Sequence, residues 1–140
     1  MTAVRLAQAS DVDAVSALDA RLTGTRKPDY WRSMLAIPER HFLVAESGQG
    51  RLAGFIAGEV RAWEFGQPPA GWVFALQIDP RLRLKGVGTA LFEGLVARFR
   101  AAGVSRVRTL VDRKDHLILS FFRAQGMVAG PSLQLDMDVG

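Results

Sequence analysis

Residues 78–92 combine an apolar strand pattern, a basic turn with two glycines and the start of an amphipathic helix. A helix start presents backbone N–H groups and a partial positive charge. Gly86 and Gly88 let an anion approach this backbone without a Cβ in the way. Three cationic side chains occupy the same turn: Arg81, Arg83 and Lys85. The pattern predicts a binding site for a phosphate-bearing ligand.

The composition is that of a folded protein with one domain, residues 1–140. The sequence has no cysteine, so thiol chemistry must come from a ligand, and no histidine lies at metal-ligand spacing. No apolar run approaches the roughly 18 residues that span a membrane. We therefore expect a soluble, cytoplasmic protein that does not bind a membrane. The formal charge is +4, but bases and acids alternate along the chain, which favours local phosphate binding over a nucleic-acid groove.

Hydrophobic periodicity predicts alternating helices and strands in the order β-α-α-β-β-β-α-β-α-β. Strands are expected at 4–6, 41–46, 52–61, 72–78, 104–111 and 133–139. Helices are expected to begin at Ser10, with Asp13 in an imperfect capping box, at Asp29, at Gly88, where Gly103 ends the helix, and at Asp115. Because a helix with short connections joins strands 72–78 and 104–111, these two strands should be parallel.

The segment 72–127 resembles the GCN5-related N-acetyltransferase (GNAT) superfamily. Residues 83–88, Arg-Leu-Lys-Gly-Val-Gly, match its Q/R-x-x-G-x-G/A pyrophosphate loop, and Asp79-Pro80 precedes the loop as usual. Residues 115–127 fit its second motif, N-x-x-A-x-x-x-Y-x-x-x-G-F. The resemblance implies an α/β (α+β) fold of three layers around a mixed central sheet of about six to seven strands.

The resemblance also implies an acetyl-CoA-dependent N-acetyltransferase that transfers the acetyl group directly to an amine of a small molecule, peptide or protein. Pantetheine would lie between two diverging strands, 72–78 and 104–111, in the manner of an additional strand. The residues expected to contact acetyl-CoA are Leu76, Gln77, Ile78, Arg83, Leu84, Lys85, Gly86, Val87, Gly88, Thr89, Asp115, Phe122 and Arg123. The sequence is compatible with a homodimer. The aromatic residues Tyr30, Trp31 and those of the segment 63–65 are candidates for the hydrophobic core, for a dimer interface or for the acceptor pocket.

The sequence departs from the family pattern at positions that carry chemistry. Leu84 replaces a common glycine, Asp115 an asparagine, and Phe122 the tyrosine often assigned as general acid. The strand before the loop offers no acid, so the base is sought elsewhere. An amine with a pKa of about 10.4 is neutral in about one molecule in a few thousand at pH 7, a handicap of about 4–5 kcal/mol. The candidate bases are Glu64, ranked first, Glu59 and Asp112, and each could instead be a solvated or ion-paired surface carboxylate.

Two other interpretations compete with the enzyme. The missing tyrosine and strand glutamate fit a noncatalytic acyl-CoA sensor or interaction module with the same fold. A nucleotide-binding Rossmann domain is disfavoured, because Leu91 occupies the position of the last glycine in G-x-G-x-x-G.

Overall fold

The computed structural model describes residues 3–82 and 86–140. The chain divides into two compact units, Met1–Leu110 and Val111–Gly140. Within the described residues, no helix is both long enough and apolar enough to cross a lipid bilayer.

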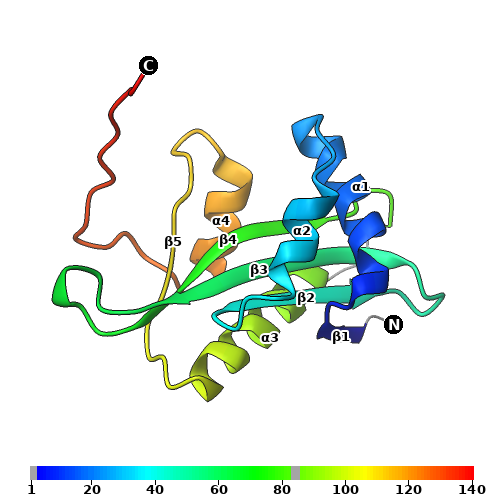
Figure 1. Cartoon of the computed structure of the whole chain (residues 1–140), viewed down its shortest axis with the longest axis horizontal. Helices are drawn as coiled ribbons and strands as arrows, with labels where there is room; N and C mark the ends of the chain where they lie inside the picture. The colour runs from blue at the N-terminus through cyan, green and yellow to red at the C-terminus, as the bar shows by residue number, and fades with distance from the viewer. Residues whose placement is uncertain (1–2, 83–85) are drawn as a thin grey trace. The chain divides into compact units, whose positions relative to one another are not determined.

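The first unit is built on a five-stranded mixed sheet with the order β1-β2-β3-β4-β5 (Figure 1). The strands are β1 (Ala3–Leu6), β2 (Arg40–Glu46), β3 (Leu52–Arg61), β4 (Ala70–Ile78) and β5 (Val107–Thr109). Neighbours from β1 to β4 are antiparallel, and β4 and β5 are parallel. The β-α-β connection through a helix therefore produces the parallel pair that the sequence predicts.

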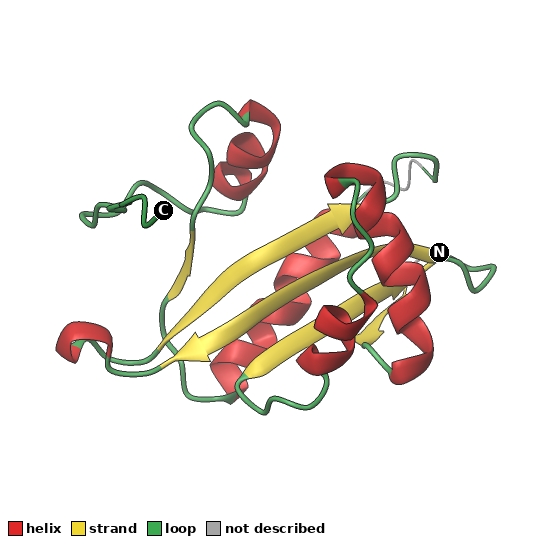
Figure 2. Ribbon diagram, turned by 45° about the horizontal axis from the view of Figure 1, so that its top comes forward, coloured by secondary structure: helices red, strands yellow, loops and turns green. Residues whose placement is uncertain are grey.

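Helices cover both faces of this sheet, as Figure 2 shows. They are α1 (Val12–Thr23) and α2 (Pro28–Met34) on one face and α3 (Val87–Ala101) on the other. On the α1/α2 face, the buried Trp31 ring lies 5.5 Å from the Phe42 ring and 5.0 Å from the Phe55 ring, measured between centroids. This aromatic cluster, together with apolar residues of α1, fixes both helices against β2 and β3.

The opposite face is packed so closely that one strand position has no room for a side chain. A Cβ added to Gly71 in β4 would lie 2.4 Å from Cδ2 of Phe99 in α3. Phe99 is almost fully buried, so its ring fills the space that a β4 side chain would need. This contact sets how close α3 lies to the sheet.

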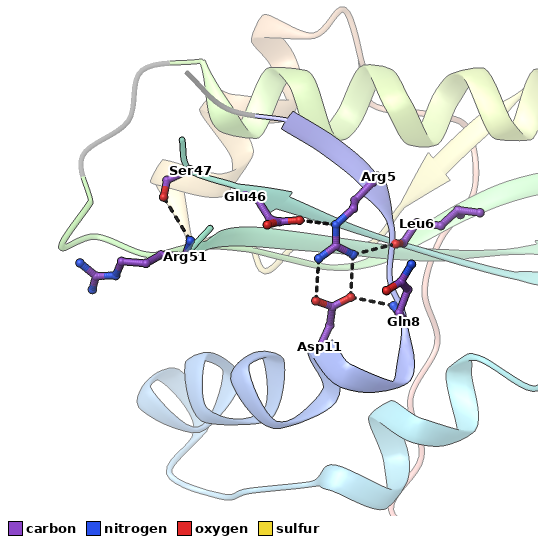
Figure 3. Close-up of polar contacts among 7 residues, drawn as sticks. All are labelled: Arg5, Leu6, Gln8, Asp11, Glu46, Ser47 and Arg51. Atoms are coloured by element: carbon purple, nitrogen blue, oxygen red, sulfur yellow. Dashed lines mark hydrogen bonds and ion pairs between the residues drawn. The ribbon is translucent and has the colours of Figure 1, made fainter. Parts of the chain in front are cut away.

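Arg5 joins β1 to the start of α1 and to the neighbouring strand (Figure 3). Its guanidinium donates to both carboxylate oxygens of Asp11, at 2.8 and 2.9 Å, and to Glu46 of β2. The hydrogen bonds from Arg5 hold the pKa of the Asp11 carboxyl below its usual range. Asp11 ends a short 3-10 turn, Ala9–Asp11, and accepts a bond of 2.7 Å from the amide of Gln8. The predicted Ser10–Asp13 capping box is therefore wrong, since Asp11 takes that role.

The second unit contains the helix α4 (His116–Ala124). The Asp115 side chain accepts a hydrogen bond of 3.1 Å from the amide of Ile118, which caps the helix expected to begin at this residue. Gly126, with φ of +100°, follows the end of the helix.

Three sequence-based expectations about the sheet are wrong. The sheet has five strands in the described chain instead of six to seven, because no strand forms at 133–139. The side chains of Leu133, Leu135 and Met137 are largely exposed, so an alternating pattern without a paired edge does not make a strand. The strand expected at 104–111 is only Val107–Thr109, because Val104 is still bonded to the carbonyl of Phe99 at the end of α3.

Candidate functional site

The first feature of the candidate site is an open backbone edge on β4. Pairing of β4 with β5 covers Gly71, Trp72 and Val73 and stops at the pair Val73–Thr109. On its other side, β4 stays paired with β3 as far as Ile78. In the described part of the chain, no strand pairs with residues 74–78 on the β5 side. Such an edge can accept an extended ligand with amide groups.

A β-bulge explains why the pairing ends there. Ala57 of β3 pairs with Ala75, but the next residue, Gly58, pairs with Val73, so Phe74 is an extra residue in β4. Bulges bend a strand and increase its twist. The hydroxyl of Thr109 donates to the Val73 carbonyl at 2.8 Å and closes the last parallel pair. Beyond this point β4 diverges from the direction of β5.

The second feature is the start of α3, which follows β4 and therefore lies at the same end of the sheet as the open edge. Gly86 precedes the helix with φ of +79°, in the left-handed region, and a Cβ added there would meet no atom of residues 3–82 or 87–140 within 4 Å. Val87 is buried, and Gly88 and Thr89 are half-buried in the first turn. First-turn amides and the helix dipole attract anions. Three predicted ligands, Arg83, Leu84 and Lys85, lie outside the described residues.

The structure brings two of the predicted bases together. Arg61 Nε lies 2.9 Å from Glu59 Oε1, and an Arg61 terminal nitrogen lies 3.9 Å from Glu64 Oε2. The indole N–H of Trp72 donates to Glu64 at 3.1 Å, and the Arg61 guanidinium lies 4.7 Å from the Trp72 ring centroid. Arg40 adds a second cation 3.6 Å from Glu59. Glu59 is thus held by two arginines, whereas Glu64 has one distant arginine and a neutral donor.

This carboxylate pair lies close to the bulge. Glu59 pairs with Trp72, two residues along β3 from the pair of Ala57 and Ala75. Ala57 faces the α1/α2 core, and strand alternation places Glu59 on the same face. The pair therefore borders the position where the β4 edge becomes available.

The remaining predicted residues have varied surroundings. Gln77 uses its side chain to donate to the Leu18 carbonyl of α1 at 2.9 Å, and its backbone pairs with Phe55 of β3. Asp112, in the second unit, accepts a bond of 2.9 Å from the Lys114 amide. Also in that unit, Phe122 is buried and Arg123 exposed.

Sequence reasoning missed the bulge at Phe74 and the indole of Trp72. Both residues lie in an apolar run, and this pattern predicts a buried strand but gives no sign of a bulge or of a polar contact. A register shift depends on the partner strand, so no local pattern could have indicated it. The sequence indicates a wide connection at 63–71, and it is the pairing of β3 with β4 that brings Trp72 back to Glu64.

A sequence model of the acetyltransferase (GNAT) family matches residues 12–127. The chain belongs to this family. It is an N-acetyltransferase that takes the acetyl group from acetyl-CoA, its co-substrate, and transfers it to an amine. No curated protein sequence matches the chain.

Solved structures confirm the GNAT fold. The aminoglycoside 6'-N-acetyltransferase AAC(6')-Ih from Acinetobacter baumannii is 13% identical with a TM-score of 0.86, covering 100% of both chains. AAC(6')-Iy, in complex with the bisubstrate analog CoA-S-monomethyl-acetylneamine, is 14% identical with a TM-score of 0.86, covering 100% of this chain and 99% of that one. A tetramutant of the BH1408 protein from Bacillus halodurans is 15% identical with a TM-score of 0.84, covering 98% and 99%.

Proposed function

We propose that this GNAT enzyme binds acetyl-CoA along the open edge of β4 and transfers the acetyl group to an amine in one step. The observation that carries the proposal is the end of β4–β5 pairing at Val73 and Thr109. It leaves the backbone of residues 74–78 without a β5 partner, next to the start of α3. Pantetheine carries amide groups that suit such an edge. Of the predicted residues Leu76, Gln77 and Ile78, Leu76 and Ile78 would offer their backbone groups to it, because those of Gln77 are turned toward β3.

The diphosphate of the co-substrate fits the first turn of α3. We assign its contacts to the backbone of Gly86, Val87, Gly88 and Thr89, because the space around Gly86 is open and the helix dipole favours an anion there. The other predicted contacts are proposed on the motifs alone: Arg83, Leu84, Lys85, Asp115, Phe122 and Arg123.

Backbone groups near the bulge would stabilise the charge that develops on the thioester carbonyl. Acyl transfer needs hydrogen-bond donors at the oxyanion, and a strand edge without a partner supplies amide N–H groups. The CoA thiolate, with a pKa of about 8.5, is a tolerable leaving group that water can reprotonate. Phe122 at the tyrosine position is therefore compatible with turnover. The absence of cysteine removes the commonest acyl-enzyme nucleophile and favours direct transfer.

Glu64 is our candidate for the general base. It is less constrained by cations than Glu59, and its side chain is 45% exposed against 23% for Glu59. The Trp72 indole N–H orients the Glu64 carboxylate. Asp112 is the third candidate, proposed on sequence alone.

The acceptor is proposed as a primary amine of a small molecule, peptide or protein. Aminoglycosides are named for the structural neighbours, whose identity of 13–14% carries the fold only. We further propose that residues 1–140 act as one acetyltransferase domain, since the family match runs across both compact units. A cytoplasmic location fits the use of acetyl-CoA, and a homodimer remains open to measurement by sedimentation.

The test is release of free CoA from acetyl-CoA against a panel of polyamines, aminoglycosides and lysine peptides. Initial velocities measured over both substrates should give intersecting lines, as expected for a ternary complex. Parallel lines, or an acetylated protein detected by mass spectrometry before the acceptor is added, would contradict direct transfer. CoA binding without turnover on any amine would favour the noncatalytic sensor.

A further inference from the structure

Asp79, the residue directly after β4, is a buried carboxylate with no part in the proposed chemistry. It is 4% exposed, and its backbone amide donates to the Ala53 carbonyl of β3 at 2.8 Å. A buried charge is costly unless it is paired and hydrogen-bonded, so its partners must compensate.

Its partners come from two directions. Arg81 binds the carboxylate through its backbone amide at 2.9 Å, its Nε at 3.2 Å and a terminal nitrogen at 3.1 Å. Arg21 of α1 reaches the same carboxylate at 3.2 Å. The hydrogen bonds from Arg81 lower the pKa of Asp79 to about 2, so the carboxylate stays ionised in any ordinary buffer.

These contacts stabilise a tight turn at the point where the chain leaves the sheet. The Leu82 amide donates to the Asp79 carbonyl at 3.2 Å, and Pro80 occupies the second turn position, where its ring fixes φ. Asp79 thus connects this turn to β3 and to α1. The sequence suggested Arg81 as a phosphate ligand, but its guanidinium is directed to Asp79 instead.

We propose that Asp79 is a positioning residue for diphosphate binding, because it holds the turn 79–82 that precedes the diphosphate site at the start of α3. The inference rests on the proposed function. When a binding site already has its bound geometry before the ligand arrives, no binding free energy is spent on ordering the site, and the ligand binds more tightly. Loss of the carboxylate charge should therefore weaken ligands that carry a diphosphate and spare those that do not.

The experiment compares three ligands on the wild-type protein and on Asp79→Asn. CoA and 3'-dephospho-CoA both carry the diphosphate, and pantetheine lacks it. Calorimetry for the first two and NMR titration for pantetheine should show about tenfold weaker binding of both diphosphate ligands to the variant and no change for pantetheine. The paired result for CoA and 3'-dephospho-CoA excludes the 3'-phosphate and assigns the loss to the adenosine diphosphate portion, which pantetheine lacks.

Asp13→Asn is the matched control, because Asp13 is an exposed acid on α1, and it should change none of the three affinities. Arg81→Gln is a second variant at a side chain 59% exposed, so folding tolerates it, and it should reproduce the diphosphate-specific loss. Equal losses for all three ligands, or no loss in either variant, would overturn the inference. Failure of the wild-type protein to bind CoA would instead overturn the proposed function, and the inference with it.

Discussion

Gly86 offers a sharp test of the phosphate site, because the cost of its backbone conformation can be separated from its contact with a ligand. With φ of +79° and no atom of the described residues within 4 Å of an added Cβ, Gly86→Ala should suffer backbone strain and no clash with those residues. The left-handed conformation costs an L-residue about 1–2 kcal/mol. Alanine also has fewer backbone conformations than glycine in the unfolded chain, which raises the unfolding free energy by about 0.4–1 kcal/mol. The net loss of unfolding free energy is about 1 kcal/mol, or about 4 °C in Tm.

Gly103, just beyond the other end of α3, is the matched control. Its φ is +85° and its added Cβ also meets nothing within 4 Å, so Gly103→Ala should lose the same stability. Only Gly86→Ala places a methyl group where the diphosphate approaches, and we expect it to weaken CoA about tenfold by steric exclusion.

Thermal unfolding and calorimetry with CoA on both variants measure the two effects. Equal Tm losses with a CoA effect confined to Gly86→Ala are the expected result. Unchanged CoA affinity in Gly86→Ala, or equal weakening in both variants, would refute the assignment of the diphosphate to this helix start.

Three further predictions concern packing, catalysis and pH. Gly71→Ala should destabilise the fold by about 2 kcal/mol in urea denaturation, because its Cβ would lie 2.4 Å from the Phe99 ring. In the double variant, Phe99→Leu should recover part of this lost stability. If the destabilisations of the two single variants simply add, the contact between residues 71 and 99 is contradicted. Glu64→Gln should lower kcat by about 10²-fold or more and leave the KM for acetyl-CoA unchanged; full activity would exclude Glu64 as base. Since the folded pKa of Asp79 is depressed to about 2, its ion pairs stabilise the fold above pH 4 and this contribution is lost as the pH falls toward 2. The stability deficit of Asp79→Asn should therefore shrink between pH 5 and pH 2, and a constant deficit would contradict the burial of a charged carboxylate.

Local sequence patterns predicted the elements whose structure depends on local chemistry. The strand at 52–61 has the predicted bounds, and the helix expected to begin at Asp115 starts at His116. The parallel pairing of β4 and β5 followed from chain connectivity alone. The glycines of the phosphate motif correctly indicated where α3 begins.

Features that depend on distant partners were missed. The bulge at Phe74 arises from the register between two strands, and the burial of Asp79 depends on Arg21, which is 58 residues away in the sequence. The alternating pattern at 133–139 predicted a strand, but a strand also needs an edge to pair with, which a pattern cannot provide. The sequence placed Glu59 and Glu64 on or just after the same strand, but it did not indicate that both contact Arg61.

A crystal structure of the protein with bound CoA would show where the diphosphate and pantetheine lie. We expect diphosphate oxygens about 3 Å from backbone amides in the first turn of α3, and pantetheine amides bonded to the edge of residues 74–78. CoA bound elsewhere, or a segment of the protein paired along that edge in its place, would contradict this expectation.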